Sequence, residues 1–175
     1  IDLLEKLIIE VLYQTGMRRA EICNLPLENI YFSKNEILVV GKGNKERIVP
    51  ISPKLSQELK FYQQNYRKAS DDTKSYFFIT NKGKKMTEKW VYSVVTRHLG
   101  KVTLKKKKSP HILRHSFATH VLNEGAEISK VKKIMGHRSL ASTQVYTNAN
   151  IEQLKKVFKT AHPRSCLLYT SPSPR

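Results

Sequence analysis

A helix-forming stretch in the second half of the chain carries imidazoles and a guanidinium among its apolar residues. Winding His111 to Asn123 at about 100° per residue places Arg114 in the middle of an apolar face, with His111 at the edge of that face. An inward arginine is costly to desolvate unless it meets an anion, and its planar guanidinium suits phosphate or carboxylate oxygens. We therefore expect His111 and Arg114 to point the same way and to hold one anionic ligand.

The composition of the chain indicates what kind of molecule carries that anion. Its 175 residues include 32 Lys and Arg against 14 Asp and Glu, a formal net charge of +18, and 39% are hydrophobic. This favours one folded domain with a polyanionic partner, of which nucleic acid is the leading candidate. The longest apolar run is too short to cross a membrane, and Cys23 and Cys166 show no disulfide or metal-ligand spacing. We expect a cytoplasmic protein without a metal ion or other cofactor.

Two helices are expected at the start of the chain. The first is apolar on almost all sides, which is typical of a helix buried in a core, and Gly16 ends it. The second covers roughly Met17 to Leu25 and points Arg18 inward and Arg19 sideways. Glu21 lies beside Arg18 at helical spacing and would orient its guanidinium, although an exposed ion pair of little energetic value is the alternative.

Three strand-like runs follow and predict a small antiparallel sheet: Asn29 to Phe32, Glu36 to Val40, and Arg47 to Ile51. The turn before the third strand is rich in glycine and carries Lys42 and Lys45, so it can reach a nucleic-acid backbone. A solvated hairpin tip is the better explanation of these lysines taken alone. The turn lacks the glycine spacing of a Walker-type phosphate loop. The fold class is therefore α+β and mainly helical.

The remaining elements are two scaffold helices, a basic loop and two helices near the predicted site. Two helices turn apolar residues inward: Ser52 begins one with Leu55, Leu59, Tyr62 and Tyr66, and Thr87 caps one with Trp90, Val91, Val94 and Val95. The basic segment Gly100 to Lys108 is predicted to be a solvated loop. Gly125 would end the His111 helix, and a helix from Ile128 to Met135 would stop at Gly136.

A larger set of side chains suits phosphoryl transfer without a metal ion: Arg18, Lys42, His111, Arg114, His137 and Tyr146. Two arginines can neutralise the nonbridging oxygens of a phosphate as phosphorus becomes pentacoordinate. A phenol can attack phosphorus to give a covalent intermediate, a lysine can protonate the departing alkoxide, and a histidine can relay the phenolic proton. The sequence has no acidic cluster that suits two metal ions, which argues against two-metal nuclease chemistry.

The motifs that contain these residues resemble those of the tyrosine recombinases, also called the phage-integrase family, and in particular its Xer-like branch. They are Thr15-Gly16-Met17-Arg18 with Glu21, the hairpin Gly41 to Arg47, the stretch His111 to His120, Met135-Gly136-His137, and Tyr146. All of them in order at compatible spacings are far more specific than any one alone. The resemblance covers Ile1 to Arg164 and implies a tyrosine-recombinase-like catalytic domain with a small three-stranded sheet.

The resemblance also implies a division of labour. Tyr146 is the nucleophile: it attacks a DNA phosphate and forms a 3′-phosphotyrosyl bond, releasing a 5′-hydroxyl that later attacks the partner strand. The other implied roles are phosphate binding for Arg18 and Arg114, general acid for Lys42, assistance of proton transfer for His111, and a phosphate hydrogen bond for His137. The implied activity is metal-independent, site-specific DNA cleavage and rejoining, as in recombination and integration.

The resemblance further implies a partner, and the sequence departs from the family in two places. Ile151, Leu154, Val157 and Phe158 mark an amphipathic helix that would dock on a neighbouring protomer and link four subunits on double-stranded DNA; folding back on its own core is the alternative. We expect the N-terminal helical domain that clamps DNA in relatives to be missing from the sequence, and residues 1–164 alone to bind DNA weakly. Residues 165–175 are expected to be a non-native tail.

Two other functions remain open. The segment from Ile128 to Tyr146 has the spacing of a helix-turn-helix, and a regulator of that kind would bind DNA without becoming covalently attached. That alternative does not explain an inward Arg114. A type IB topoisomerase, whose active site is similar, would relax supercoiled plasmid as a monomer without a specific site.

Overall fold

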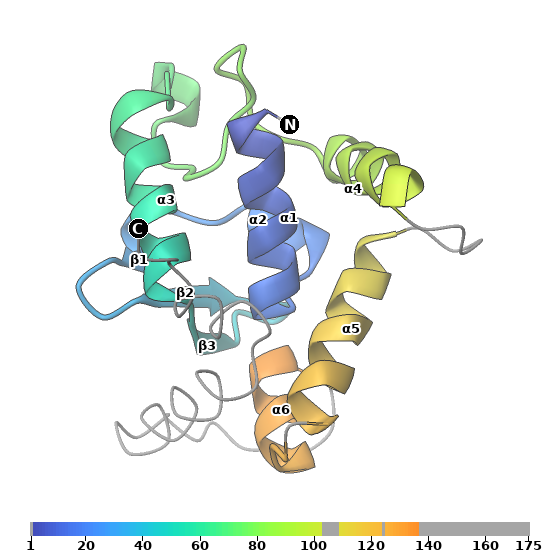
Figure 1. Ribbon diagram of the computed structural model, residues 1–175. Coiled ribbons are helices and arrows are strands. Elements are labelled where there is room, and N and C mark those ends of the chain that lie inside the picture. The colour runs from blue at the N-terminus through green and yellow to red at the C-terminus, as the bar shows by residue number, and fades with distance from the viewer. Residues whose placement is uncertain (1, 103–108, 124, 137–175) are drawn as a thin grey trace, which may run out of the picture.

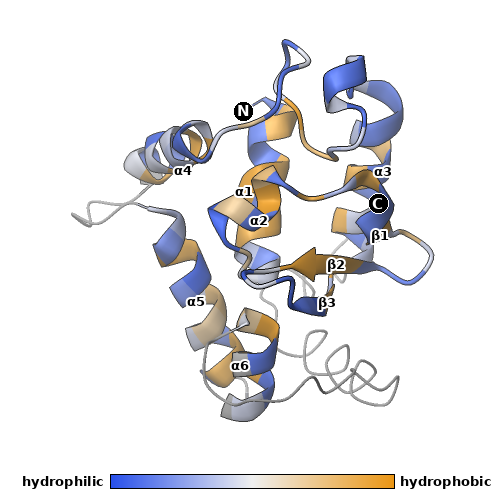
Figure 2. Cartoon of the chain, turned by 180° about the vertical axis from the view of Figure 1, so that it is seen from behind, coloured by the Kyte–Doolittle hydropathy of each residue, from blue (hydrophilic) through white to orange (hydrophobic). Residues whose placement is uncertain are grey.

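Helix α1 (Leu3–Thr15) lies at the centre of the fold (Figure 1). The computed structural model describes residues 2–102, 109–123 and 125–136. In this structure α1 contacts α2 (Arg19–Cys23), α3 (Pro53–Asn65), α4 (Glu88–Val102) and α5 (Pro110–Asn123). Its Leu7, Ile8 and Val11 side chains are 0% exposed, and Figure 2 shows hydrophobic residues along much of the helix. The prediction of a helix buried on several sides is confirmed.

A three-stranded antiparallel sheet adjoins these helices, as predicted. Its strands are β1 (Ile30–Tyr31), β2 (Glu36–Val40) and β3 (Glu46–Pro50), in the order β1-β2-β3. Val39 pairs with Arg47, and Ile37 pairs with Val49. All four of these residues are at most 5% exposed. The first strand is shorter than predicted because Leu27–Asn29 form the short 3-10 helix η1.

The second helix is shorter than predicted at both ends. Arg18 lies outside α2 in an extended conformation, with φ −81° and ψ 155°. Its N–H donates to a Glu21 carboxylate oxygen at 2.7 Å, which satisfies a main-chain donor that has no partner within the helix. The prediction of a helix over Met17 to Leu25 is wrong because this interaction makes α2 begin after Arg18.

Helices α3 and α4 begin where the sequence predicts and end differently. The Ser52 hydroxyl accepts from the Leu55 N–H at 3.2 Å, and the Thr87 hydroxyl accepts from the Trp90 N–H at the same distance. Tyr66 is 55% exposed, so the prediction that it belongs to the core is wrong: α3 ends at Asn65, before that side chain can turn inward. The 3-10 helix η2 (Asp71–Thr73) follows.

The basic segment before α5 contains more helix than predicted. Instead of giving way to a loop at Gly100, α4 continues through Gly100 and Lys101 to Val102. This part of the prediction is wrong, because the first three residues of the predicted loop, Gly100, Lys101 and Val102, continue the helix after Leu99. The rest of the predicted loop lies outside the described residues.

Helix α6 (Ile128–Met135) brings the end of the described chain to the sheet and to α1. It contacts α5 and β3, and α5 contacts α1 (Figure 1). Gly125 and Gly136 adopt positive φ angles of 87° and 60°, which confirms the predicted ends of α5 and α6. Among the described residues, no helix is both long enough and apolar enough to span a membrane.

Gly16 sits where α1, α5 and α6 meet, and we expect its replacement by alanine to be costly. Its φ is +60°, and an added Cβ would lie 2.8 Å from Phe117 Cδ1 and 2.9 Å from Met135 Sδ. Gly16→Ala should lower the free energy of unfolding by about 2–4 kcal/mol, measured by urea unfolding. Gly43, with φ +76° and nothing within 4 Å of an added Cβ, is the matched control. Gly43→Ala should cost only about 1 kcal/mol, and equal losses would contradict the crowding at Gly16.

Candidate active site

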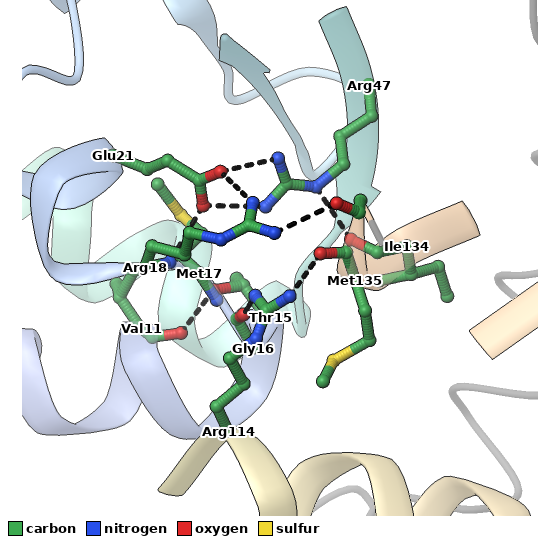
Figure 3. Close-up of polar contacts among 11 residues, drawn as sticks. Val11, Thr15, Gly16, Met17, Arg18, Glu21, Arg47, Arg114, Ile134 and Met135 are labelled. Carbon is green, nitrogen blue, oxygen red and sulfur yellow. Dashed lines mark hydrogen bonds and ion pairs between the residues drawn. The ribbon is translucent and has the colours of Figure 1, made fainter. Parts of the chain in front are cut away.

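Three arginines meet where α1, α2, β3, α5 and α6 come together, and two of them bind one carboxylate (Figure 3). They are Arg18, Arg47 and Arg114, and the carboxylate is that of Glu21. We call these four residues the arginine cluster. It carries three positive charges and one negative charge, so an anion that enters it meets an excess of positive charge.

Glu21 is the common partner of two of these arginines. Its carboxylate accepts from Arg47 at 2.9 and 2.7 Å and from the Arg18 guanidinium at 2.9 Å. Burial alone would raise the pKa of the Glu21 carboxyl, but the hydrogen bonds and charge of Arg47, with the N–H groups of Arg18, lower it below its ordinary value. Glu21 therefore stays ionised and fixes the direction of the Arg18 side chain. The prediction that Glu21 orients Arg18 is confirmed.

The same three arginines also hold the C-terminal end of α6. Arg47 Nε donates to the Ile134 carbonyl at 2.6 Å, Arg114 donates to the Met135 carbonyl, and Arg18 donates to the Gly136 carbonyl at 2.9 Å. The last carbonyls of a helix have no partner within the helix, and cationic donors there also suit the helix dipole. Three consecutive main-chain oxygens thus bind three arginines from different parts of the chain.

Arg114 faces inward, as its place in the apolar stripe predicts, and is 8% exposed. Its guanidinium also donates to the Gly16 carbonyl. Burial, and after it the positive charge of Arg18, lower the pKa of Arg114 to about 10, so the group remains charged at neutral pH. Among the described residues, the bonds to Gly16 and Met135 use two of the five N–H groups of the guanidinium, which leaves the others for a ligand.

Arg18 and Arg114 come together, whereas Arg19 lies elsewhere. The first two donate to the carbonyls of two consecutive residues, Gly136 and Met135, and after burial the charge of Arg18 lowers the pKa of Arg114. The Arg18 side chain is 41% exposed, which places it at the open edge of the cluster rather than inside the core, where the helical pattern predicts it. Arg19 lies 3.8 Å from the Glu88 carboxylate and over the Tyr92 ring.

Lys42 lies in the exposed turn between β2 and β3, and its neighbour Gly41 lies against the arginine cluster. A Cβ added at Gly41 would lie 3.3 Å from Glu21 Oε1 and 3.6 Å from Arg47 Nη1. The turn therefore starts against the cluster, and the Lys42 side chain extends from there into solvent. Its role as general acid stays a prediction.

Of the three remaining predicted site residues, His111 alone lies within the described part of the chain. His111 is exposed in the first turn of α5, and among the described residues it makes no hydrogen bond or ion pair with the cluster. Arg114, three residues on, is buried and reaches inward to α1 and α6, and the expectation that the two side chains hold one ligand stays a prediction. His137 and Tyr146 lie outside the described residues, as do Cys166, the amphipathic helix predicted after Tyr146 and residues 165–175.

Arg47 is the member of the cluster that the sequence prediction missed. It is 5% exposed and forms a bidentate ion pair with Glu21. A signal was present: side chains alternate between the faces of a strand, so Arg47 shares a face with Val49 and Ile51. An arginine in line with two apolar residues indicates a buried guanidinium that needs an anionic partner.

We expect Glu21→Gln to change how stability depends on pH. Because the folded-state pKa of Glu21 is lowered, its contribution is complete above the ordinary carboxyl pKa and is lost as pH falls through the folded-state value. The variant should be about 2–4 kcal/mol less stable than the unaltered chain at pH 7, with the gap closing towards pH 3. Urea unfolding at several pH values measures this. Glu28→Gln, at an exposed carboxylate, is the control, and a gap independent of pH would contradict the assignment.

The chain is similar in sequence to one family of known proteins. A model of the phage integrase family matches residues 1–153. The tyrosine recombinase XerC of Anoxybacillus flavithermus (strain DSM 21510 / WK1) is 41% identical over 162 residues, which are 90% of this chain and 54% of the relative. XerC of Bacillus pumilus (strain SAFR-032) is 38% identical over 163 residues, or 90% of this chain and 53% of the relative. The chain thus spans about half the length of these relatives.

Solved structures share the fold. The crystal structure of XerA recombinase has a TM-score of 0.72 and 33% identity, covering 93% of this chain and 60% of that one. XerH site-specific recombinase, solved bound to its difH substrate as a pre-cleavage complex, has a TM-score of 0.68 and 25% identity, covering 90% of this chain and 47% of that one. The predicted fold, mainly helical with a three-stranded antiparallel sheet, is confirmed.

Proposed function

This chain belongs to the phage integrase family, and from that premise we propose that residues 1–164 form the catalytic domain of a Xer-like tyrosine recombinase. Its proposed activity is site-specific cleavage and rejoining of double-stranded DNA. The observation that carries the proposal is the placement of Arg18 and Arg114 on adjacent carbonyls, beside the segment that leads to His137. Two guanidinium groups that keep N–H donors beyond those bonded to described residues suit the nonbridging oxygens of one phosphodiester.

The proposed cleavage step exchanges one phosphate ester for another. The phenolic oxygen of Tyr146 bonds to phosphorus while the bond from phosphorus to the 5′ oxygen breaks, and the strand keeps a 3′-phosphotyrosyl end. Lys42 donates a proton to the departing 5′ oxygen, and His111 assists transfer of the phenolic proton. Arg18 and Arg114 neutralise the charge that grows on the nonbridging oxygens, with a hydrogen bond from His137.

Rejoining is the same exchange in reverse with a different alcohol. The 5′-hydroxyl of the partner strand attacks the phosphotyrosyl phosphorus, and the phenol leaves as Tyr146 regains its proton. Because the ester bond energy is kept in the intermediate, no nucleotide cofactor and no external energy source is needed.

Covalent capture tests this function and identifies the DNA site in the same experiment. The chain, alone and fused behind the N-terminal half of the Anoxybacillus flavithermus relative, is incubated with nicked duplexes that contain random sequence. Protein-linked DNA is recovered under denaturing conditions and sequenced. We expect enrichment of one sequence family and, after trypsin and nuclease digestion, a nucleotide adduct on peptide 139–155, in which Tyr146 is the single tyrosine.

Two other results would overturn the proposal. Protein that binds the duplexes but is never linked to them in either form would be a non-catalytic DNA-binding protein. Linkage to any sequence, with relaxation of supercoiled plasmid by the monomer, would instead identify topoisomerase activity. In both cases the enrichment expected of a site-specific enzyme would be missing.

We further propose that four subunits assemble on two DNA duplexes through the amphipathic helix predicted at Ile151, Leu154, Val157 and Phe158. The apolar spacing of these residues supports docking on a neighbouring protomer. Light scattering of the protein with its captured duplex should give a tetramer, and replacing Leu154 and Phe158 by Ser should leave smaller complexes. The proposed action on DNA implies a cytoplasmic protein.

A further inference from the structure

Arg47 is the arginine of the cluster to which the proposed chemistry gives no part. It is nevertheless the most enclosed of the three, at 5% exposed, and its guanidinium makes bonds to two other elements. Nη1 and Nη2 donate to the two Glu21 oxygens at 2.9 and 2.7 Å, and Nε donates to the Ile134 carbonyl at 2.6 Å. One side chain on β3 therefore binds both α2 and the end of α6 (Figure 3).

We propose that Arg47 is a positioning residue for DNA cleavage, which sets the places of Arg18, the Lys42 turn and the end of α6 relative to one another; the inference rests on the proposed function. Arg47 is not proposed to touch the phosphate. Its bidentate pair with Glu21 is a strong and directional contact that occupies both terminal nitrogens. Of the two arginines that bind Glu21, Arg18 is the one that remains open to a ligand, since its side chain is 41% exposed.

The action of Arg47 on Arg18 passes through Glu21. The Glu21 carboxylate accepts both from the Arg18 main-chain N–H at 2.7 Å and from its guanidinium at 2.9 Å. Without Arg47, that carboxylate would keep a single cationic partner and could rotate towards solvent with it. Arg47 thus holds Glu21 in the direction that aims the Arg18 guanidinium at the Gly136 carbonyl, next to the bond of Arg114 to Met135.

The other two segments are held directly. Arg47 lies in β3, which follows the turn that carries Lys42, and an added Cβ at Gly41 would lie 3.6 Å from Arg47 Nη1. The bond from Nε to Ile134 fixes the last turn of α6, which leads into His137. Catalytic groups must be held within a fraction of an ångström, and a misplacement of about 1 Å can cost about 100-fold in rate.

The first test is Arg47→Lys, assayed with the captured duplex in the form of the protein that gives wild-type adduct. Lysine keeps the charge but has no planar fork for two carboxylate oxygens and a carbonyl. We expect the single-turnover rate of adduct formation to fall about 100-fold, while the dissociation constant for DNA changes by less than about 3-fold. Arg67→Lys is the matched control, since Arg67 also bonds to several main-chain carbonyls, but away from the cluster. It should lower the melting temperature and leave the rate of the folded protein unchanged.

A double-mutant cycle separates positioning from simple loss of stability. If Arg47 acts through Glu21, combining Arg47→Lys with Glu21→Gln should cost hardly more than the worse single change. If the losses in cleavage rate of the two single variants multiply in the double variant, the inference is overturned. A folded Arg47→Lys variant that cleaves at the wild-type rate would also overturn it.

If Arg47→Lys does not fold, Arg47→Met with Glu21→Gln removes both buried charges together and should restore folding. That variant should still cleave about 100-fold more slowly; wild-type cleavage by it would also overturn the inference. Absence of adduct with the unaltered protein would refute the proposed function instead.

Discussion

The Tyr146→Phe variant is expected to bind duplex DNA as the unaltered chain does and to form no covalent adduct with it. Phenylalanine keeps the ring and its packing but has no oxygen that can bond to phosphorus. The yield of adduct on the captured duplex should fall by at least about 10³-fold, while the dissociation constant should change by less than about 3-fold. Gel-shift titration and denaturing electrophoresis of the same samples measure the two quantities.

Tyr66→Phe is the matched control for this loss. Tyr66 is 55% exposed, and its ring centroid lies 5.6 Å from that of Phe61, a contact that phenylalanine keeps. The control should bind and form adduct at the wild-type level. If Tyr146→Phe forms adduct in comparable yield, the nucleophile is another residue, and the tyrosine in the adducted peptide will show which.

Replacing Arg114 by alanine is expected to have the second largest effect. The change removes one of the two guanidinium groups proposed to bind the scissile phosphate, which should slow single-turnover cleavage by about 10³-fold. It also leaves the buried Gly16 and Met135 carbonyls without their donor, so the melting temperature should fall as well. Rates must therefore be measured well below the melting temperature of the variant, with circular dichroism on the same sample.

Arg19→Ala is the control for Arg114→Ala, because it removes the same charge from a position outside the arginine cluster. Arg19 contacts Glu88 and Tyr92 at the partly exposed surface between α2 and α4. Such exposed pairs contribute little, so its loss should change the cleavage rate by less than about 3-fold. A folded Arg114→Ala variant that cleaves as fast as this control would remove Arg114 from the proposed site.

Much of the fold follows from local patterns in the sequence. Apolar residues occur on almost all sides of α1, so the sequence predicts a helix that is buried on several sides. Glycine-rich and polar turns separate β2 and β3 from their neighbours, so a small antiparallel sheet could be predicted. Arg114 could be predicted as inward because three neighbouring turns of one helix determine its face.

The parts that failed depend on contacts between distant segments. Arg47 meets Glu21 and Ile134 from positions 26 and 87 residues away along the chain, and no helical or strand period encodes those distances. Arg18 was misplaced for a different, local reason: Glu21, three residues on, satisfies its main-chain N–H, so Arg18 precedes α2 and remains partly open. The roles of His137 and Tyr146 stay predictions from their motifs.

The acceptors at the end of α6 are main-chain oxygens, which every amino acid supplies. Ile134 and Met135 can therefore vary among apolar side chains of similar size without removing a bond to the arginines, provided that the backbone keeps its course. The donors have no such freedom, and neither has Gly136, where an added Cβ would lie 3.3 Å from Arg47 Nη1. An engineer could thus redesign the core face of α6 for thermal tolerance while leaving untouched the groups that would handle DNA.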